Sequence, residues 1–241
     1  MQVIDGNWYM NGVDWNDEGC IHTDEELLEV IGKVGFLLLF DNDIPGFSVE
    51  NMTDASCWWN GDAETDPWEW RITLSRTGKV AYGKFFGNKA GFISKKWFPY
   101  FANFRRDGYD FDARYEDGLA SFDDKELYEL LDANAPILSR PLKRMGNYRK
   151  GGRKGFDSAI TRLQKQCYVL ISDFRYAEDK FGNEYGWGIA EYSTPEKFFG
   201  RKFTDKVYNR TPEESYDRLF RQLKKILPGV EDKQLKKILS V

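Results

Sequence analysis

The second half of the chain carries the pattern that most narrows its fold. Three segments there place apolar residues at the spacing of an amphipathic helix, and two strand-like runs follow them. In the third segment, for example, Phe156, Ile160 and Leu163 recur at i, i+4 and i+7. The predicted helices cover residues 123–134, 138–146 and 156–167, and the predicted strands cover 168–176 and 185–192.

Three helices followed by a β-hairpin is the order of a winged helix-turn-helix. In that arrangement the third helix enters the major groove of DNA, and the hairpin, or wing, touches the backbone. Interaction modules without a nucleic-acid partner share the order, so it does not fix a function. Two further helices are predicted behind it. The first is N-capped by Thr211 with Pro212 at its first position, and the second covers residues 231–239.

A strict alternation marks the middle of the first half. Residues 68–75 (WEWRITLS) alternate so that Trp68 and Trp70 share one face of a predicted strand. A turn at residues 76–79 then leads into a returning strand at 80–87. The pattern predicts a β-hairpin whose tryptophans lie in the core.

These elements predict an α+β protein with two domains. An aromatic content of 16% is far too high for a disordered chain. We expect residues 1–118 to form an α/β region with a small antiparallel sheet. Residues 119–241 are expected to form the winged-helix-like region with its trailing helices. The boundary is placed in the polar connection over residues 105–118.

Two tryptophans stand apart from the predicted strand. Trp58 and Trp59 are adjacent, so neither a helix nor a strand hides both on one face. Glu64 and Asp66 follow them in an acidic loop. We consider a ligand-facing wall of Trp58 and Trp59, with Glu64 and Asp66 as candidate catalytic carboxylates that position water or stabilise a cationic sugar. The simpler alternative is that the loop covers the core.

The charges of the chain are strongly segregated. Residues 41–70 hold eight acidic and no basic side chains, whereas residues 137–165 hold nine basic and one acidic. A basic stripe is typical of nucleic-acid binding, but the two segments could also pack on each other within the fold or between two copies. The residues predicted to bind duplex DNA are Lys143, Arg144, Arg149, Lys150, Arg153, Lys154, Arg162, Gln164 and Lys165.

Other classes of site have little support in the sequence. The single histidine, His22, limits a histidine-based metal centre or a catalytic triad, so we predict no metal and no cofactor. The three cysteines are widely spaced, which favours reduced thiols in the cytoplasm. The first residues lack the pattern of a signal peptide, and no apolar run is long enough for a membrane span.

Four segments together resemble the AlkZ-related family of bacterial proteins. They are GDAETDPWEWR (61–71), AYGKFFGNKAGFIS (81–94), FDSAITRLQKQCYVLISDFR (156–175) and EYGWGIAEYST (184–194). The resemblance spans roughly residues 23–195 and implies distant kinship with AlkZ-type DNA glycosylases, which are built of winged-helix units and excise alkylated or crosslinked bases.

The catalytic signature of those glycosylases is an early Gln-x-Gln or Gln-x-Asp motif. Here Gln-x-Gln occurs late, at residues 164–166, so no catalytic role is carried over to it.

Three hypotheses follow from the sequence. The first is a winged-helix DNA-binding protein without catalysis, associated with DNA repair or regulation. The second is a glycosylase-like enzyme acting on alkylated bases. The third is an interaction module whose acidic and basic segments bind each other. The sequence leaves open whether the protein is an enzyme.

Overall fold

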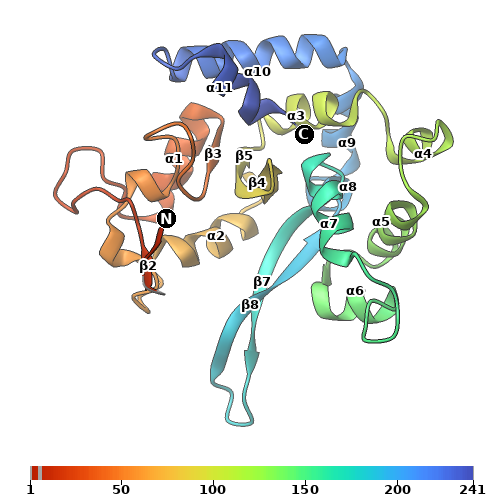
Figure 1. Ribbon diagram of the computed structural model, residues 1–241, viewed down its shortest axis with the longest axis horizontal. Coiled ribbons are helices and arrows are strands. Elements are labelled where there is room, and N and C mark those ends of the chain that lie inside the picture. Colours follow the sequence, from red (N-terminus) through yellow and green to blue (C-terminus); the bar gives the residue numbers. More distant parts are fainter. Residues whose placement is uncertain (1, 5–6, 241) are drawn as a thin grey trace. The chain divides into compact units, whose positions relative to one another are not determined.

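The computed structural model describes residues 2–4 and 7–240 and divides the chain into two compact units. Unit 1 comprises residues 1–98 and 216–241, and unit 2 comprises residues 99–215. Both mix helices with antiparallel strands, so the fold is α+β (Figure 1). The predicted boundary after residue 118 falls inside unit 2, and the last 26 residues, 216–241, return to unit 1.

The centre of unit 1 is a short antiparallel sheet in the order β3-β5-β4. Its strands are β3 (Phe36–Leu38), β4 (Val80–Phe86) and β5 (Lys89–Ser94). Gly91 lies where β5 runs beside β3, and a Cβ there would stand 2.5 Å from the carbonyl oxygen of Leu37. Only glycine therefore allows this register. The predicted returning strand at 80–87 is confirmed as β4.

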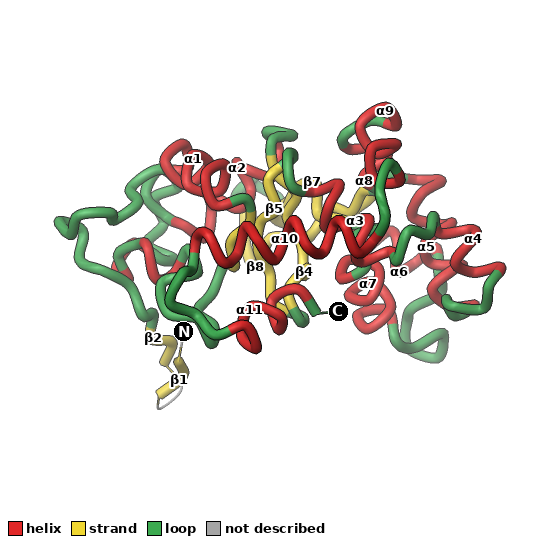
Figure 2. Tube along the Cα trace, turned by 90° about the horizontal axis from the view of Figure 1, so that it is seen from above, coloured by secondary structure: helices red, strands yellow, loops and turns green. Residues whose placement is uncertain are grey.

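Helices cover this sheet. α1 (Asp24–Val34) begins at Thr23, whose side chain accepts a hydrogen bond from the backbone amide of Glu26. α1 contacts α2 (Pro67–Arg76), and both helices contact the sheet (Figure 2). The remaining elements of unit 1 are β1 (Gln2–Ile4), β2 (Asn7–Tyr9), η1 (Glu50–Met52), η2 (Ala55–Cys57), α11 (Asp232–Leu239) and the part of α10 (Pro212–Ile226) from Tyr216 onward.

The predicted strand at residues 68–75 is wrong, because these residues form α2. Asp66 accepts a hydrogen bond from the backbone amide of Trp68 at 2.8 Å, and Pro67 occupies the first turn. An Asp cap followed by Pro starts a helix. The apolar residues also fit a helical face, since Trp70 and Leu74 are buried four positions apart. The expectation that Trp70 belongs to the core is confirmed.

Unit 2 follows the order helix, strand, helix, helix, hairpin. α5 (Phe122–Asn134) precedes β6 (Ile137–Leu138), α6 (Ser139–Met145), α7 (Phe156–Lys165), β7 (Leu170–Glu178) and β8 (Glu184–Ser193). β8 pairs with β7 on one side and with the short β6 on the other. The three predicted helices and the hairpin are confirmed, whereas β6 was not predicted.

The far end of the β7–β8 hairpin extends away from α5, α6 and α7 (Figure 1). The three helices contribute buried leucines to the core of unit 2. They are Leu127 and Leu131 of α5, Leu142 of α6 and Leu163 of α7. The hairpin is thus held at its base by the core of unit 2, while Phe181, Tyr185 and Trp187 near its tip are exposed.

The expected polar connection at residues 105–118 is largely helical. It contains the end of α3 (Phe98–Arg106) and all of α4 (Phe111–Glu116). Arg105 and Arg106 are buried, although two consecutive arginines are typical of a solvated segment. Unit 2 ends in α8 (Pro195–Phe198), α9 (Arg201–Thr204), η3 (Asp205–Tyr208) and the start of α10.

Within residues 2–4 and 7–240, no helix is both long and apolar enough to cross a lipid bilayer.

Candidate nucleic-acid interface and polar cavity

The predicted DNA-binding segment occupies α6, α7 and the loop that joins them. That loop folds back on itself, because the amide of Arg153 donates to the carbonyl of Asn147 at 2.8 Å. Asn147, Gly151 and Gly155 all have positive φ, which shortens the connection. The loop therefore presents its side chains from a compact base.

Three of the predicted DNA-binding cations are engaged within the fold. Arg153 forms ion pairs with Asp123 and Glu126 of α5. Arg162 donates to Asp124 twice, from Nη2 to Oδ1 at 2.6 Å and from Nε to Oδ2 at 3.1 Å. These hydrogen bonds raise the pKa of both guanidinium groups above their ordinary values.

Lys143 is the third engaged cation, with its Nζ 3.1 Å from Oδ1 of Asp157. Lys143, Arg153 and Arg162 therefore pair with carboxylates of unit 2, and none of these partners belongs to the acidic segment at 41–70. Two of the three bind α5, at residues 123–126, rather than the acidic segment at 41–70.

Gln164 does not lie on the exposed face of α7. Its side chain is 1% exposed, and its Nε2 donates to the carbonyl of Ile160 at 3.2 Å. In this conformation the side chain is not exposed to a base edge, so its predicted role in base reading has no support in the geometry of α7. The exposed positions of α7 are instead Asp157, Ser158 and Arg162.

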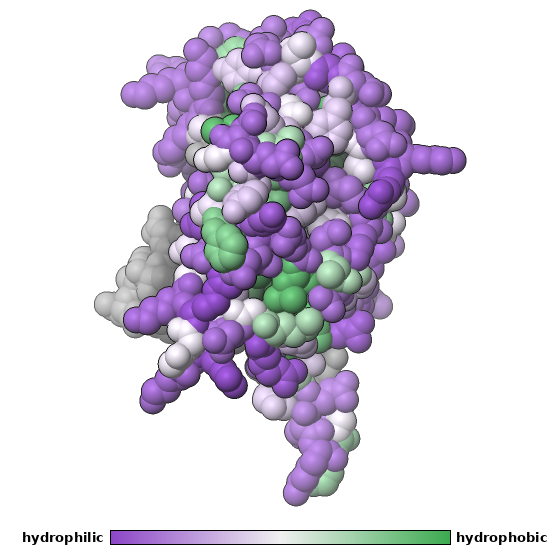
Figure 3. All heavy atoms as spheres, turned by 90° about the vertical axis from the view of Figure 1, so that its right-hand side faces the viewer, coloured by the Kyte–Doolittle hydropathy of each residue, from purple (hydrophilic) through white to green (hydrophobic). Residues whose placement is uncertain are grey.

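A group of exposed cations remains on the same segment. None of them forms an ion pair with any carboxylate in the described part of unit 2. Lys165 is half-buried at the end of α7. The face that carries α4, α5 and α6 is largely hydrophilic, with hydrophobic side chains in small groups only (Figure 3). We call the exposed cations without a carboxylate partner among the described residues of unit 2 the α6–α7 basic cluster. They are Arg140, Arg144, Arg149, Lys150 and Lys154.

The turn at the hairpin tip is tightly ordered by Asp179. Its carboxylate accepts the backbone amides of Phe181 at 2.7 Å and Asn183 at 3.0 Å, and also the side-chain amide of Asn183 at 3.0 Å. These hydrogen bonds lower the pKa of Asp179 below its ordinary value. The tip therefore presents its aromatic side chains from a defined turn.

The two adjacent tryptophans of unit 1 have different environments. Trp58 is buried, and its Nε1 donates to Oγ1 of Thr53 at 3.0 Å, so it belongs to the core rather than to an exposed wall. Trp59 is 37% exposed and has a φ of 57°, a conformation that bulky residues rarely adopt. Its ring contacts those of Trp58 and Trp68.

Asp66 has a structural role that occupies its carboxylate. It caps α2 and also accepts a backbone hydrogen bond from Trp59. Burial raises the pKa of Asp66, with these hydrogen bonds acting in the opposite direction. Glu64, by contrast, is exposed, and its backbone carbonyl accepts the indole N–H of Trp70 at 2.9 Å. The carboxylate of Asp66 is therefore not directed to an open site.

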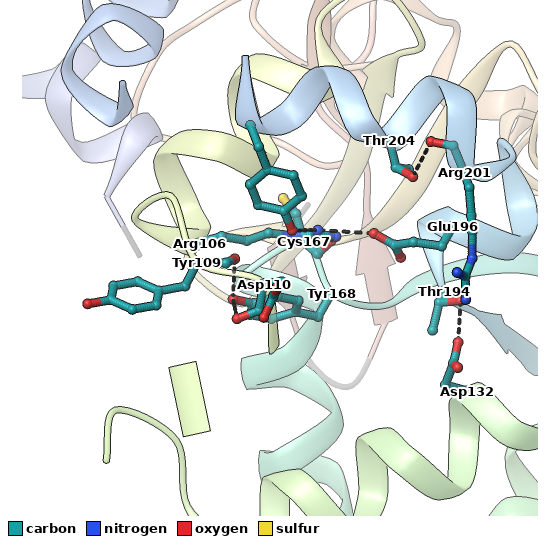
Figure 4. A network of polar contacts seen from close by, with 11 residues as sticks. Arg106, Tyr109, Asp110, Asp132, Cys167, Tyr168, Thr194, Glu196, Arg201 and Thr204 are labelled. Atoms are coloured by element: carbon teal, nitrogen blue, oxygen red, sulfur yellow. Dashed lines mark hydrogen bonds and ion pairs between the residues drawn. The ribbon is translucent and has the colours of Figure 1, made fainter. Parts of the chain in front are cut away.

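A polar network in unit 2 was not found from the sequence. The guanidinium of Arg106 is 1% exposed and donates to Glu196 at 3.1 Å, to the hydroxyl of Tyr208 at 2.7 Å and to the carbonyl of Cys167 at 2.7 Å. In Figure 4 its side chain points toward Glu196, which comes from α8. Burial alone would lower the pKa of Arg106, but Glu196 and the tyrosine hydroxyls, led by that of Tyr208, raise it above its ordinary value.

This network forms one side of a cavity of about 560 Å³. Its walls come from α4, α5, α8, α9 and η3, so segments nearly one hundred residues apart in sequence meet there. The lining is mostly carboxylates and aromatic rings, with Arg106 and Arg201 as its two guanidinium groups. We call it the Arg106 cavity. Burial raises the pKa of Tyr128 in its wall well above the ordinary value.

His22 packs beside Trp15, and the three cysteines are buried free thiols. The Nε2 of His22 lies 2.8 Å from the carbonyl of Trp15, and its ring packs on the indole of that residue. Burial raises the pKa of the Cys167 thiol to about 11, which keeps it protonated. The described side chains bring no three His, Cys, Asp or Glu residues together in a group that could hold a metal ion.

The family profile described as AlkZ related matches residues 21–240, which is nearly the whole chain. The chain belongs to the AlkZ-related family. The match confirms the resemblance carried by the four sequence segments and extends it through the C-terminal helices. Neither the curated proteins nor the solved structures include a significant match to the chain.

Proposed function

We propose that unit 2 is a winged helix-turn-helix that binds duplex DNA through its phosphate backbone. In this proposal α5, α6 and α7 are the three helices, β6 is the short strand after the first of them, and β7–β8 is the wing. The pairing of β6 with β8 supports this assignment, since it ties the first strand to the base of the hairpin.

The observation that carries the proposal is the α6–α7 basic cluster. Its five cations lie on α6 and on a glycine-containing loop, where a phosphate can approach the backbone closely. A surface of this charge attracts any polyanion, and membership of the AlkZ-related family favours DNA as that polyanion.

The exposed face of α7 favours binding without base sequence preference. Direct readout needs amides or guanidinium groups that reach base edges in the major groove. Here Gln164 is buried and Arg162 is bound to Asp124, which leaves α7 few groups that could read a base. The protein should therefore bind unrelated duplexes with similar affinity.

The glycosylase alternative has no comparable support at the predicted carboxylates. Asp66 uses its oxygens to cap α2 and to hold Trp59, so it is a poor candidate to position water. Self-association between residues 41–70 and 137–165 is also weakened, because three basic side chains of the second segment already have partners.

Fluorescence anisotropy with short duplexes of unrelated sequence tests the proposal. The triple variant Arg149→Ala, Lys150→Ala, Lys154→Ala should bind far more weakly than the parent protein. The matched control removes three exposed lysines elsewhere, in Lys225→Ala, Lys233→Ala, Lys236→Ala, and should bind like the parent. Equal losses in both triple variants would show that binding reflects overall charge, and a strong preference for one duplex would contradict backbone recognition.

A further inference from the structure

We propose that the Arg106 cavity binds a linear organic polyamine. The inference concerns a site of unit 2 distinct from the α6–α7 basic cluster and does not depend on DNA binding. Its volume of about 560 Å³ lies within the usual range of small-molecule sites, about 300–1,000 Å³.

The charge of the lining selects a cation. Six carboxylates line the cavity against the two guanidinium groups. Arg106 is already paired with Glu196, which leaves five carboxylates around Arg201 alone. The Nζ atom of Lys125 lies 3.5 Å from Oε1 of Glu129 and offsets the charge of that one carboxylate. An anion would meet net repulsion here, whereas a cation gains from each remaining carboxylate. The remaining carboxylates are those of Asp112 and Asp205, together with Asp110, which also caps α4, and Asp132, which also accepts a hydrogen bond from the hydroxyl of Thr194.

Unpaired acceptors favour a cation that carries N–H groups. The Oε2 atom of Glu196 is buried and has no hydrogen-bond partner, although Oε1 of the same carboxylate holds Arg106. The hydroxyl of Tyr128, on the facing helix α5, likewise makes no hydrogen bond with the described residues. A buried acceptor without a donor is costly, so a protonated amine that donates to Oε2 of Glu196 would satisfy it, and the same ligand could also donate to the hydroxyl of the half-buried Tyr128.

The aromatic wall adds a second attraction. Tyr128 stacks on Phe111 with their ring centroids 4.2 Å apart, and the ring of Tyr168 meets both edge-on. Phe111 and Tyr168 are almost fully buried, and Arg106 already lies over the ring of Tyr168, so the half-buried ring of Tyr128 is the one that can contact an ammonium group or the methylene segments of the ligand.

The spacing of the carboxylates distinguishes a polyamine from a metal ion. A divalent cation needs several oxygen ligands around one point. No described group of three carboxylates in unit 2 is close enough to provide this. Charges distributed along a flexible chain match a lining whose carboxylates come from α4, α5, α8 and η3.

Isothermal titration calorimetry with spermidine, on the full chain and without DNA, tests the proposal. We expect saturable binding with one site. Tyr128→Phe removes only the hydroxyl and should weaken binding by up to about tenfold, the usual size of one hydrogen bond. Asp205→Asn, at the exposed rim, should weaken it by a smaller factor. The control Glu116→Gln, an exposed carboxylate of the same unit outside the cavity, should bind like the parent.

A third variant, Glu196→Gln, removes the carboxylate but also leaves Arg106 without its ion-pair partner, so its folding must be checked by circular dichroism. Tyr128→Phe keeps that ion pair and decides the matter if Glu196→Gln does not fold. The proposal is overturned if the parent shows no saturable binding, if Tyr128→Phe and Asp205→Asn both bind like the parent, or if magnesium at equal ionic strength produces the same heat.

Discussion

Arg162 holds Asp124 through two hydrogen bonds, one of 2.6 Å and one of 3.1 Å. Arg162 lies on α7, the helix proposed to enter the groove, and Asp124 is a buried residue near the start of α5. The pair joins the first and third helices of the proposed winged helix. It therefore stabilises the unit while removing one cation from the charge that we propose binds DNA.

Removal of this pair should cost stability. Asp124→Asn keeps the size of the side chain but loses the charge that binds Arg162. Because charge-assisted hydrogen bonds contribute about 1.5–3 kcal/mol, we expect the free energy of unfolding to fall by about 1–3 kcal/mol. Urea unfolding followed by circular dichroism measures the change. A variant as stable as the parent would mean that the pair is screened by solvent.

Release of Arg153 should strengthen DNA binding. Asp123→Asn with Glu126→Gln removes both carboxylates that engage Arg153, and so adds one free cation beside the α6–α7 basic cluster. One more phosphate contact should steepen the salt dependence by about one unit in the slope of log K against log salt. Anisotropy titrations at several salt concentrations measure the slope, with Glu116→Gln as control. An unchanged slope in the double variant would show that Arg153 does not face DNA.

Trp70 should matter far more for stability than Trp59. The Trp70 side chain is 1% exposed, so Trp70→Ala should lower the free energy of unfolding by about 3–5 kcal/mol. Trp59 is 37% exposed, so Trp59→Ala should cost less than about 1.5 kcal/mol. Thermal and urea unfolding of the two variants give the comparison. Similar losses would mean that Trp59 supports the core as strongly as Trp70 does.

Asp66 should make stability depend on pH. Its folded-state pKa is raised by burial, so the folded state holds this proton more tightly than the unfolded chain does. The free energy of unfolding should therefore fall as the pH rises from about 4, the usual aspartate value, through the raised folded-state pKa of Asp66. Over this range the unfolded chain loses the proton more readily than the folded protein does. Asp66→Asn keeps a cap acceptor, so it should be at least as stable as the parent at neutral pH.

That advantage of Asp66→Asn should disappear below the usual aspartate pKa, where both side chains are neutral. Unfolding midpoints of the two proteins at neutral and acidic pH give the test, and Asp66→Ala, which loses the cap, should be less stable at both. A constant difference between parent and Asp66→Asn across this range would contradict the burial effect.

The sequence predicted those elements whose signals are local. The Thr211 cap followed by Pro212 and the apolar spacing of Phe156, Ile160 and Leu163 each describe neighbouring residues on one helix. The alternation at residues 68–75 predicted a strand wrongly. Over two helical turns, a spacing of two residues (strand) and a spacing of 3.6 residues (helix) can pick out overlapping sets of apolar positions. The Asp66–Pro67 pair decided between them, and it was the stronger signal.

The candidate sites could be predicted only in part, because tertiary structure decides which basic side chain pairs with which carboxylate. The charge of residues 137–165 was visible, but the engagement of Arg153 and Arg162 by α5 depends on how three helices pack. The Arg106 cavity left no local signal. Its network joins Arg106 to Glu196 and Tyr208, which lie 90 and 102 positions further along the chain.

The salt dependence of duplex DNA binding tests the central claim most directly. If the five cations of the α6–α7 basic cluster each contact a phosphate, the slope of log K against log salt should be about −4.5, a loss of several hundredfold in affinity between about 50 and 200 mM salt. The triple variant Arg149→Ala, Lys150→Ala, Lys154→Ala should reduce the slope by about three units. No binding by the parent at low salt, or an unchanged slope in the triple variant, would contradict the account.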